Sequence, residues 1–380
     1  MGECGGHVEA PAAKEPKDLD GNLQKSERPP APNERPPLGE CGGHVEAPAA
    51  EEPKDLDGCL PTYHPPFWYR GRHLQTLWGP LFRNWRRPPQ RRERLETPDG
   101  DFVDLDWLAG GPARGPLVLI LHGLEGSSRS HYARGLLRGA GRLGCRAVVL
   151  HFRSCSGEVN RLPRLYHSGE TTDLAWVIER LRERASRIGV VGISLGGNVL
   201  LKWLGEMGET APREVLAAAA ISTPFDLAAC AAVLDRGFNR AVYTESFLRT
   251  MKAKIRAKAG LYEGGRLDLR AVQRARTFAE YDRFFTAPLN GFADERDYWA
   301  RASSGPYLER IRRPTLLINA VNDPFMPGAC LPTETVARSR WLEAAFVEEG
   351  GHVGFLDGPL GRSSWAERRA LAFLRDHLLR

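Results

Sequence analysis

Gly192-Ile193-Ser194-Leu195-Gly196 is the stretch that decides the fold of this 380-residue chain. It stands between a β-branched run, residues 187–191, and a helix-forming run, residues 198–204. A Gly-x-Ser-x-Gly pattern between a strand and a helix is typical of a sharp turn that presents a serine hydroxyl for attack on a carbonyl carbon. The glycines are needed because a side chain beside such a bend would collide with the strand or the helix. We therefore predict that Ser194 is a nucleophile.

A serine nucleophile needs a base, and the base needs an acid that orients it. Asp323 follows a predicted buried strand, residues 315–321, and so lies at the carboxyl end of a strand, where α/β sheets place their chemistry. His352 lies in a glycine-rich loop after the last predicted strand, residues 341–347. The order serine, acid, histidine along the chain is that of one large fold family of serine hydrolases. We predict a Ser194, His352, Asp323 triad.

The transition state also needs hydrogen-bond donors for the developing oxyanion. A buried strand at residues 117–121 is predicted to run into the loop His122-Gly123-Leu124-Glu125-Gly126. The backbone N–H of Leu124 in that loop, and that of Leu195 after the nucleophile, are the expected pair of donors. This chemistry requires no metal and no organic cofactor, and none is predicted.

Strands and helices alternate through most of the chain. Residues 94–97 and 102–108 predict a hairpin around an Asp-Gly turn. Later segments predict a mainly parallel, doubly wound sheet; the strands are expected at 117–121, 146–152, 187–191 and 215–221, and the helices at 130–142, 170–184 and 198–204. The rhythm breaks at about residues 223–313, where amphipathic helices predict an insertion that caps the serine and excludes water.

Several strings together resemble the YheT-like branch of the α/β-hydrolase superfamily. They are residues 71–76 (GRHLQT), 122–127 (HGLEGS), 151–157 (HFRSCSG), 166–171 (YHSGET), 192–198 (GISLGGN) and 286–292 (TAPLNGF). The resemblance spans residues 62–380 and implies an α/β-hydrolase fold and hydrolysis of carboxylic esters by Ser194, His352 and Asp323. One position departs from the family, which usually has glycine where Ser154 stands. If that site needs a positive φ, serine costs about 1 kcal/mol there.

The predicted substrate is a small-molecule ester with a short to medium acyl chain. Two other functions stay open. An acyltransferase would use the same triad with an alcohol in place of water, and His352 with Asp357 matches a His-x4-Asp acyltransferase pattern. A binding protein on a hydrolase fold would use no triad at all.

Residues 1–60 differ from the rest of the chain. Gly2 to Gly21 recurs almost verbatim as Gly39 to Gly58, and the composition, rich in Pro, Gly, Ala and acid, predicts disorder. These residues hold six Lys and Arg against thirteen Asp and Glu, so they carry −7 and the remainder carries +13 of the total +6. The duplicated pairs Cys4/His7 and Cys41/His44 have zinc-ligand chemistry, but a tolerated tandem duplication is the favoured interpretation.

Charge and composition narrow the partners and the compartment. An arginine run favours a solvated connector, with contact to phosphate or an acidic membrane as the alternative; it comprises Arg83, Arg86, Arg87, Arg91, Arg92 and Arg94. No nucleic-acid fold accompanies it, and no apolar run is long enough to span a bilayer. Seven cysteines without scaffold spacing predict free thiols and a cytoplasmic location. The oligomeric state is left open.

Overall fold

A computed structural model describes Gly2 and residues 62–83, 86–262, 264–265 and 267–380. The chain divides into two units, Met1–Glu52 and Pro53–Arg380, and the fold below is that of the second. The expectations of a disordered tail and of a Cys-x-x-His metal site fall on residues 1–60, outside the described residues except for Gly2.

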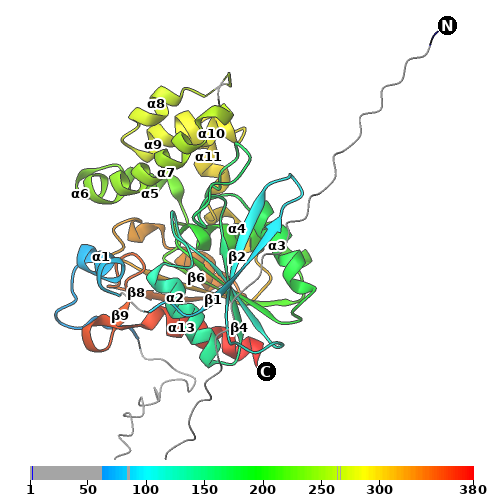
Figure 1. The fold of residues 1–380 in the computed structure, drawn as a ribbon. Coiled ribbons are helices and arrows are strands. Elements are labelled where there is room, and N and C mark those ends of the chain that lie inside the picture. The colour runs from blue at the N-terminus through cyan, green and yellow to red at the C-terminus, as the bar shows by residue number, and fades with distance from the viewer. Residues whose placement is uncertain (1, 3–61, 84–85, 263, 266) are drawn as a thin grey trace, which may run out of the picture. The chain divides into compact units, whose positions relative to one another are not determined.

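An eight-stranded sheet forms the centre of the second unit (Figure 1). Its strands are β1 (Gln90–Glu96), β2 (Phe102–Leu108), β3 (Leu117–Leu121), β4 (Arg146–His151), β5 (Ile188–Ile193), β6 (Val215–Ile221), β7 (Thr315–Ala320) and β8 (Leu342–Val347). They lie in the order β1-β2-β4-β3-β5-β6-β7-β8. The pairs β1–β2 and β2–β4 are antiparallel and the others parallel, which confirms a hairpin leading into a doubly wound sheet.

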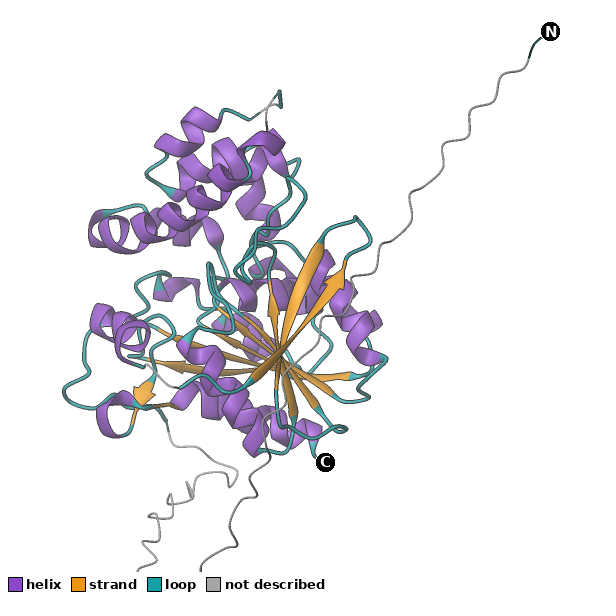
Figure 2. Cartoon of the chain, in the orientation of Figure 1, coloured by secondary structure: helices purple, strands orange, loops and turns teal. Residues whose placement is uncertain are grey.

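Helices cover both faces of this sheet (Figure 2). Alternate residues of the buried strands divide between two apolar cores, as the period of two requires. One core includes Leu119 and Leu121 and packs under α3 (Thr172–Arg182) and α4 (Leu195–Met207), with α12 (Thr333–Arg338) at its margin. The other includes Val118 and Ile120 and packs under α2 (His131–Arg142) and α13 (Trp365–Leu378).

The insertion between β6 and β7 is helical, as predicted from the sequence, and we call it the cap. Its α-helices are α5 (Leu227–Leu234), α6 (Gly237–Asn239), α7 (Glu245–Ala257), α8 (Leu269–Arg274), α9 (Phe278–Tyr281), α10 (Ala287–Leu289) and α11 (Glu295–Ala302). They gather on one side of the sheet (Figure 1). A separate apolar core, which includes Leu248, Ile255 and Phe285, holds them together.

Shorter elements complete the fold. A two-stranded ladder pairs β9 (Leu356–Asp357) with β10 (Ser363–Ser364). Single turns of 3-10 or π-helix lie at residues 208–210, 240–244, 259–262, 282–286, 305–310, 328–330 and 359–361. None of the helices in the described ranges is long and apolar enough to cross a membrane.

One expectation from the sequence needs correction. The arginine run is not simply a solvated connector, because Arg83, Arg92 and Arg94 pair with Glu367, Asp106 and Asp104 at 2.6, 2.8 and 2.9 Å. In the aromatic segment before the run, Tyr63 and Tyr69 are buried, whereas Phe67 is 86% exposed.

Ser154 has the positive φ, 64°, that glycine would favour, so its departure from the family carries backbone strain. Its side chain offsets part of that cost. Ser154 Oγ donates to Asn160 Oδ1 at 2.6 Å and accepts from the Asn160 N–H at 3.0 Å, so the hydroxyl holds this buried loop.

Candidate active site

Ser194 occupies the turn between β5 and α4 with φ 53° and ψ −120°, a backbone conformation that few non-glycine residues adopt. The flanking glycines are required by contact. A Cβ on Gly192 would lie 2.5 Å from the Gly196 carbonyl oxygen, and one on Gly196 would lie 2.6 Å from the His122 carbonyl oxygen. The turn that presents the Ser194 side chain can therefore form only because Gly192 and Gly196 carry no side chain.

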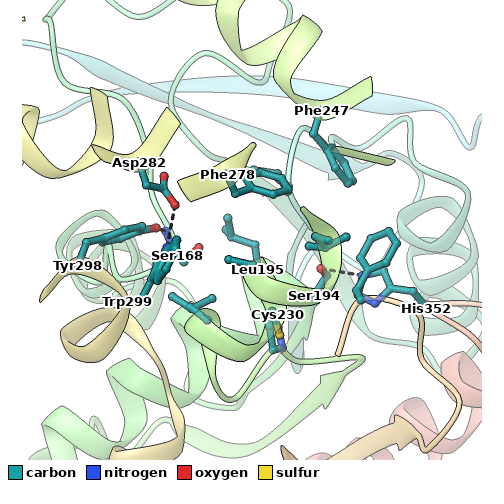
Figure 3. A pocket seen from close by; sticks show the side chains of 16 residues that line it. Ser168, Ser194, Leu195, Cys230, Phe247, Phe278, Asp282, Tyr298, Trp299 and His352 are labelled. Atoms are coloured by element: carbon teal, nitrogen blue, oxygen red, sulfur yellow. Dashed lines mark hydrogen bonds between the residues drawn. The ribbon is translucent and has the colours of Figure 1, made fainter. Parts of the chain in front are cut away.

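The structure brings the three predicted triad side chains into one hydrogen-bonded line, of which Figure 3 shows the contact between Ser194 and His352. His352 Nε2 lies 2.9 Å from Ser194 Oγ, and His352 Nδ1 lies 2.8 Å from Asp323 Oδ2. A carboxylate only accepts hydrogen bonds, so Nδ1 carries the proton and Nε2 is free to accept the serine proton. The other Asp323 oxygen accepts the Phe325 N–H at 2.8 Å, and the Phe325 ring stacks on His352.

Helix α1 (Arg72–Phe82) positions the loop that carries His352. The His352 N–H donates to Thr76 Oγ1 at 2.9 Å. Gln75, fully buried, accepts at Oε1 from Asn322 Nδ2 at 2.9 Å and from the Gly350 N–H at 3.0 Å. Asn322, next to Asp323, accepts from the same glycine, so one network fixes the acid and the base relative to each other. Gln75, Thr76 and Asn322 were not predicted from the sequence as parts of the site. The only signal for Gln75 and Thr76 was their place in the family string at residues 71–76.

The loop after β3 leaves one N–H available at the predicted oxyanion site. The N–H groups of Gly123 and Glu125 donate to Tyr132 Oη and Tyr166 Oη at 3.0 and 2.8 Å. Within the described ranges neither Leu124 nor Leu195 donates its N–H to another group. Both residues line the same pocket as Ser194.

A buried ionic contact joins this loop to the cap. Glu125 has a positive φ of 55°, and its carboxylate accepts from Lys254 Nζ of α7 at 2.6 Å and from Tyr166 Oη at 2.8 Å. Lys254 also lies 3.2 Å from Cys155 Sγ, whose pKa burial raises to about 11. That thiol is protonated at neutral pH, which agrees with a structural rather than a reactive cysteine.

An apolar pocket of roughly 630 Å³, open solvent at its mouth included, extends from Ser194 beneath the cap. Its walls come mainly from α5 and from aromatic residues of the cap and the Asp323 loop; they include Leu227, Ala231, Leu234, Phe247, Phe278, Trp299 and Phe325 (Figure 3). Asp282 also lines it and is buried; burial raises the pKa of this carboxyl to about 7. It accepts hydrogen bonds from Thr286 Oγ1 at 2.6 Å and Trp299 Nε1 at 2.8 Å. No role for Asp282 was predicted from the sequence.

A second pocket meets Ser194 and His352 from the side of α1 and α2. Leu77 and Pro80 of α1 line it, together with Arg129 and Arg134. The serine therefore lies between an apolar pocket beneath the cap and a pocket with a basic rim. No group of three or more His, Cys, Asp or Glu side chains suited to a metal is found among the described residues.

Comparison with known proteins identifies the family. Residues 116–359 match the alpha/beta hydrolase fold family. The chain is 41% identical to YheT of Escherichia coli (strain K12), whose name proposes an esterase, over 80% of this chain and 91% of YheT. It is 30% identical to "Phospholipase ABHD3" of Homo sapiens, over 80% of this chain and 76% of that protein. A solved structure of the Pyrococcus furiosus esterase Pf2001 covers 76% of this chain and 93% of its own, with 17% identity and a TM-score of 0.48. On the strength of the family match and the YheT identity, the chain belongs to the YheT-like branch of the α/β hydrolases.

Proposed function

We propose that this protein hydrolyses carboxylic esters through an acyl-enzyme on Ser194. The observation that carries the proposal is the hydrogen-bonded line from Asp323 through His352 to Ser194, which ends at a pocket lined by apolar side chains. Ester hydrolysis also agrees with the names of the two relatives, an esterase and a phospholipase.

The chemistry proceeds by two acyl transfers. Ser194 Oγ attacks the ester carbonyl carbon while His352 Nε2 takes the hydroxyl proton. The carbonyl oxygen becomes an oxyanion that the Leu124 and Leu195 N–H groups stabilise, each by about 3 kcal/mol. The intermediate then expels the alcohol, which receives its proton from His352. Water, deprotonated by His352, attacks the acyl-enzyme and releases the acid, and the proton returns to Ser194. Asp323 holds the histidine tautomer throughout and stabilises the imidazolium.

The apolar pocket beneath the cap is the proposed acyl site because apolar side chains form most of its wall, and the expected acyl chain is short to medium. The partner in this proposal is a small-molecule ester. The free thiols of Cys145, Cys155, Cys230 and Cys330 agree with the cytoplasmic location expected from the sequence, which stays a prediction.

Acyl transfer to an alcohol receives no separate support. Asp357, the acid of the His-x4-Asp pattern, pairs with Arg368 at 2.5 Å and accepts a hydrogen bond from Ser363. It is thus engaged away from His352, whose Nδ1 already has Asp323.

A panel of p-nitrophenyl esters of graded acyl length tests the proposal. The full-length protein should hydrolyse the shorter esters. Ser194→Ala should lose most of the turnover, and Asp323→Asn should lower kcat by about 10⁴-fold because the histidine takes the wrong tautomer. Ser168→Ala is the matched control, since Ser168 lines the same pocket but has no contact with His352 (Figure 3). Equal turnover by Ser194→Ala and the wild type would refute the assignment of the nucleophile.

A further inference from the structure

Large apolar side chains lie exposed on and around α1. Leu81 and Phe82 at the end of the helix are 59% and 62% exposed, and Leu74, about two turns earlier, is 39% exposed. Phe67 before the helix and Leu360 in the loop between β9 and β10 are 86% and 68% exposed. A surface with so many protruding large apolar groups is typical of an interaction site rather than of scattered single exposures. We call these five residues the α1 patch.

Trp78 joins the members of the α1 patch. Its ring packs on Phe82, with centroids 4.5 Å apart, and on Trp68, next to Phe67, with centroids 5.1 Å apart. Its indole N–H donates to the Leu360 carbonyl oxygen at 3.4 Å. The exposed side chains from three separate segments therefore belong to one region of the surface.

Arginines flank the α1 patch. Arg87 follows Phe82 closely in the chain, Arg362 follows Leu360, and both are exposed. Arg129 and Arg134 line one pocket together with Arg83. Burial lowers the pKa of Arg134, and the charges of Arg87, Arg138 and Arg129 lower it further. Neither Arg87 nor Arg362 forms an ion pair with any side chain in the described ranges.

The same region borders the route to the nucleophile. Helix α1 packs against the start of α2 so closely that a Cβ on Gly79 would lie 2.6 Å from the His131 ring. Leu77 and Pro80 of α1, with Arg129 before α2, line the pocket that reaches Ser194 and His352. A partner bound to the α1 patch would therefore lie beside the pocket that reaches Ser194 and His352.

We propose that the α1 patch and its flanking arginines dock this protein on a membrane surface that contains anionic lipids. Exposed aromatic and aliphatic side chains enter the boundary between headgroups and acyl chains, and arginines beside them contact lipid phosphates. Tryptophan, such as Trp78 here, is a typical anchor at the interface between membrane and water. Arg87 and Arg362 are exposed and have no carboxylate paired with them among the described side chains, so they give the edge of the patch an unneutralised positive charge, which favours an anionic bilayer as the occupant. Docking in this way brings α1, whose Leu77 and Pro80 line the second pocket at Ser194, against the lipid.

Flotation of the full-length protein with lipid vesicles tests the proposal without any turnover, so its outcome is independent of the esterase chemistry. The protein should float with vesicles of phosphatidylcholine mixed with phosphatidylglycerol, and much less with phosphatidylcholine alone. Arg87→Gln with Arg362→Gln should weaken binding to the mixed vesicles by about 30-fold. Leu81→Ser with Phe82→Ser should weaken it by at least about 10-fold.

Two variants away from the α1 patch serve as controls. Arg213→Gln removes an arginine whose side chain is 92% exposed, and Leu379→Ser removes a leucine that is 46% exposed. Both should bind like the wild type, and thermal unfolding should show that every variant is folded. Absence of binding to the mixed vesicles, equal binding to both vesicle types, or equal losses in the control variants would overturn the proposal. Absence of binding to the mixed vesicles would indicate that the α1 patch binds a protein partner and not a membrane.

Discussion

At the scale of single residues, Asp282 makes stability depend on pH. Burial raises the pKa of this carboxyl to about 7, whereas the unfolded chain titrates near the usual 3.8. Between those two values the native protein holds a proton that the unfolded chain has released. The free energy of unfolding therefore falls by about 1.4 kcal/mol for each unit that the pH rises through this window. We expect Asp282→Asn to remove this contribution, because the amide stays neutral and keeps an acceptor for Trp299.

Urea unfolding of both proteins near pH 5 and near pH 8 measures the effect. The Asn variant should gain stability relative to the wild type at the higher pH. Asp226→Asn is the control, since Asp226 is an exposed helix cap whose amide analogue caps equally well. A constant difference between Asp282→Asn and the wild type at both pH values would contradict the raised pKa.

The sequence could predict Ser194, Asp323 and His352 because each follows a strand with a recognisable local pattern. It could not predict the residues that hold them. Gln75 reaches Asn322 and Gly350, which are 247 and 275 positions away in the chain. No local pattern marks a glutamine as a partner at that distance. The burial of Asp282 could not be predicted for the same reason, since it arises only when the cap folds.

At the scale of elements, helix α1 was not predicted. Its outward face carries Leu74, Leu81 and Phe82, whereas the outward face of a surface helix usually carries polar side chains. Pro80 inside the helix further obscures the pattern. The cap was predicted from its length and its amphipathic helices. Its contact with the loop after β3 was not predicted, because Lys254 and Glu125 are 129 positions apart. We call this loop, residues 122–126, the oxyanion loop because it carries the proposed oxyanion donor, the Leu124 N–H.

The contact between α7 and the oxyanion loop predicts that the cap affects catalysis. Lys254→Met should leave the Glu125 carboxylate buried with Tyr166 as its remaining partner, which loosens the loop that carries the Leu124 N–H. We expect kcat for a short ester to fall about 10-fold with a smaller change in KM, since the donor acts mainly in the transition state.

A double variant shows whether this effect passes through Glu125. Glu125→Gln combined with Lys254→Met removes both charges, so its loss of kcat should be smaller than the product of the two single losses. If the loss of kcat in the double variant equals the product of the two single losses, Glu125 and Lys254 act independently and the proposed coupling is wrong. Lys252→Met, on the same helix but bonded to the Ala275 carbonyl, is the matched control.

At the scale of the whole molecule, charge divides along the chain as the sequence indicates. Residues 1–60 carry −7 and the remainder carries +13. The sheet, both helical layers, the cap and the triad all come from residues after 61. We therefore expect a chain that begins at residue 61 to hydrolyse short esters with unchanged kcat/KM. It should also unfold at the same temperature as the full chain.

The same truncation should change association with charged surfaces. Removal of the acidic segment raises the net charge from +6 to +13, and long-range attraction to an anionic surface rises with net positive charge. The shortened chain should therefore bind vesicles that contain phosphatidylglycerol more tightly than the full chain at low ionic strength. The difference should shrink as salt is added, because salt screens exposed charges. A salt series of flotation measurements on both chains provides the comparison. Equal affinities at low salt would show that the acidic segment has no electrostatic effect on docking, and a loss of kcat/KM would show that the hydrolase fold depends on it.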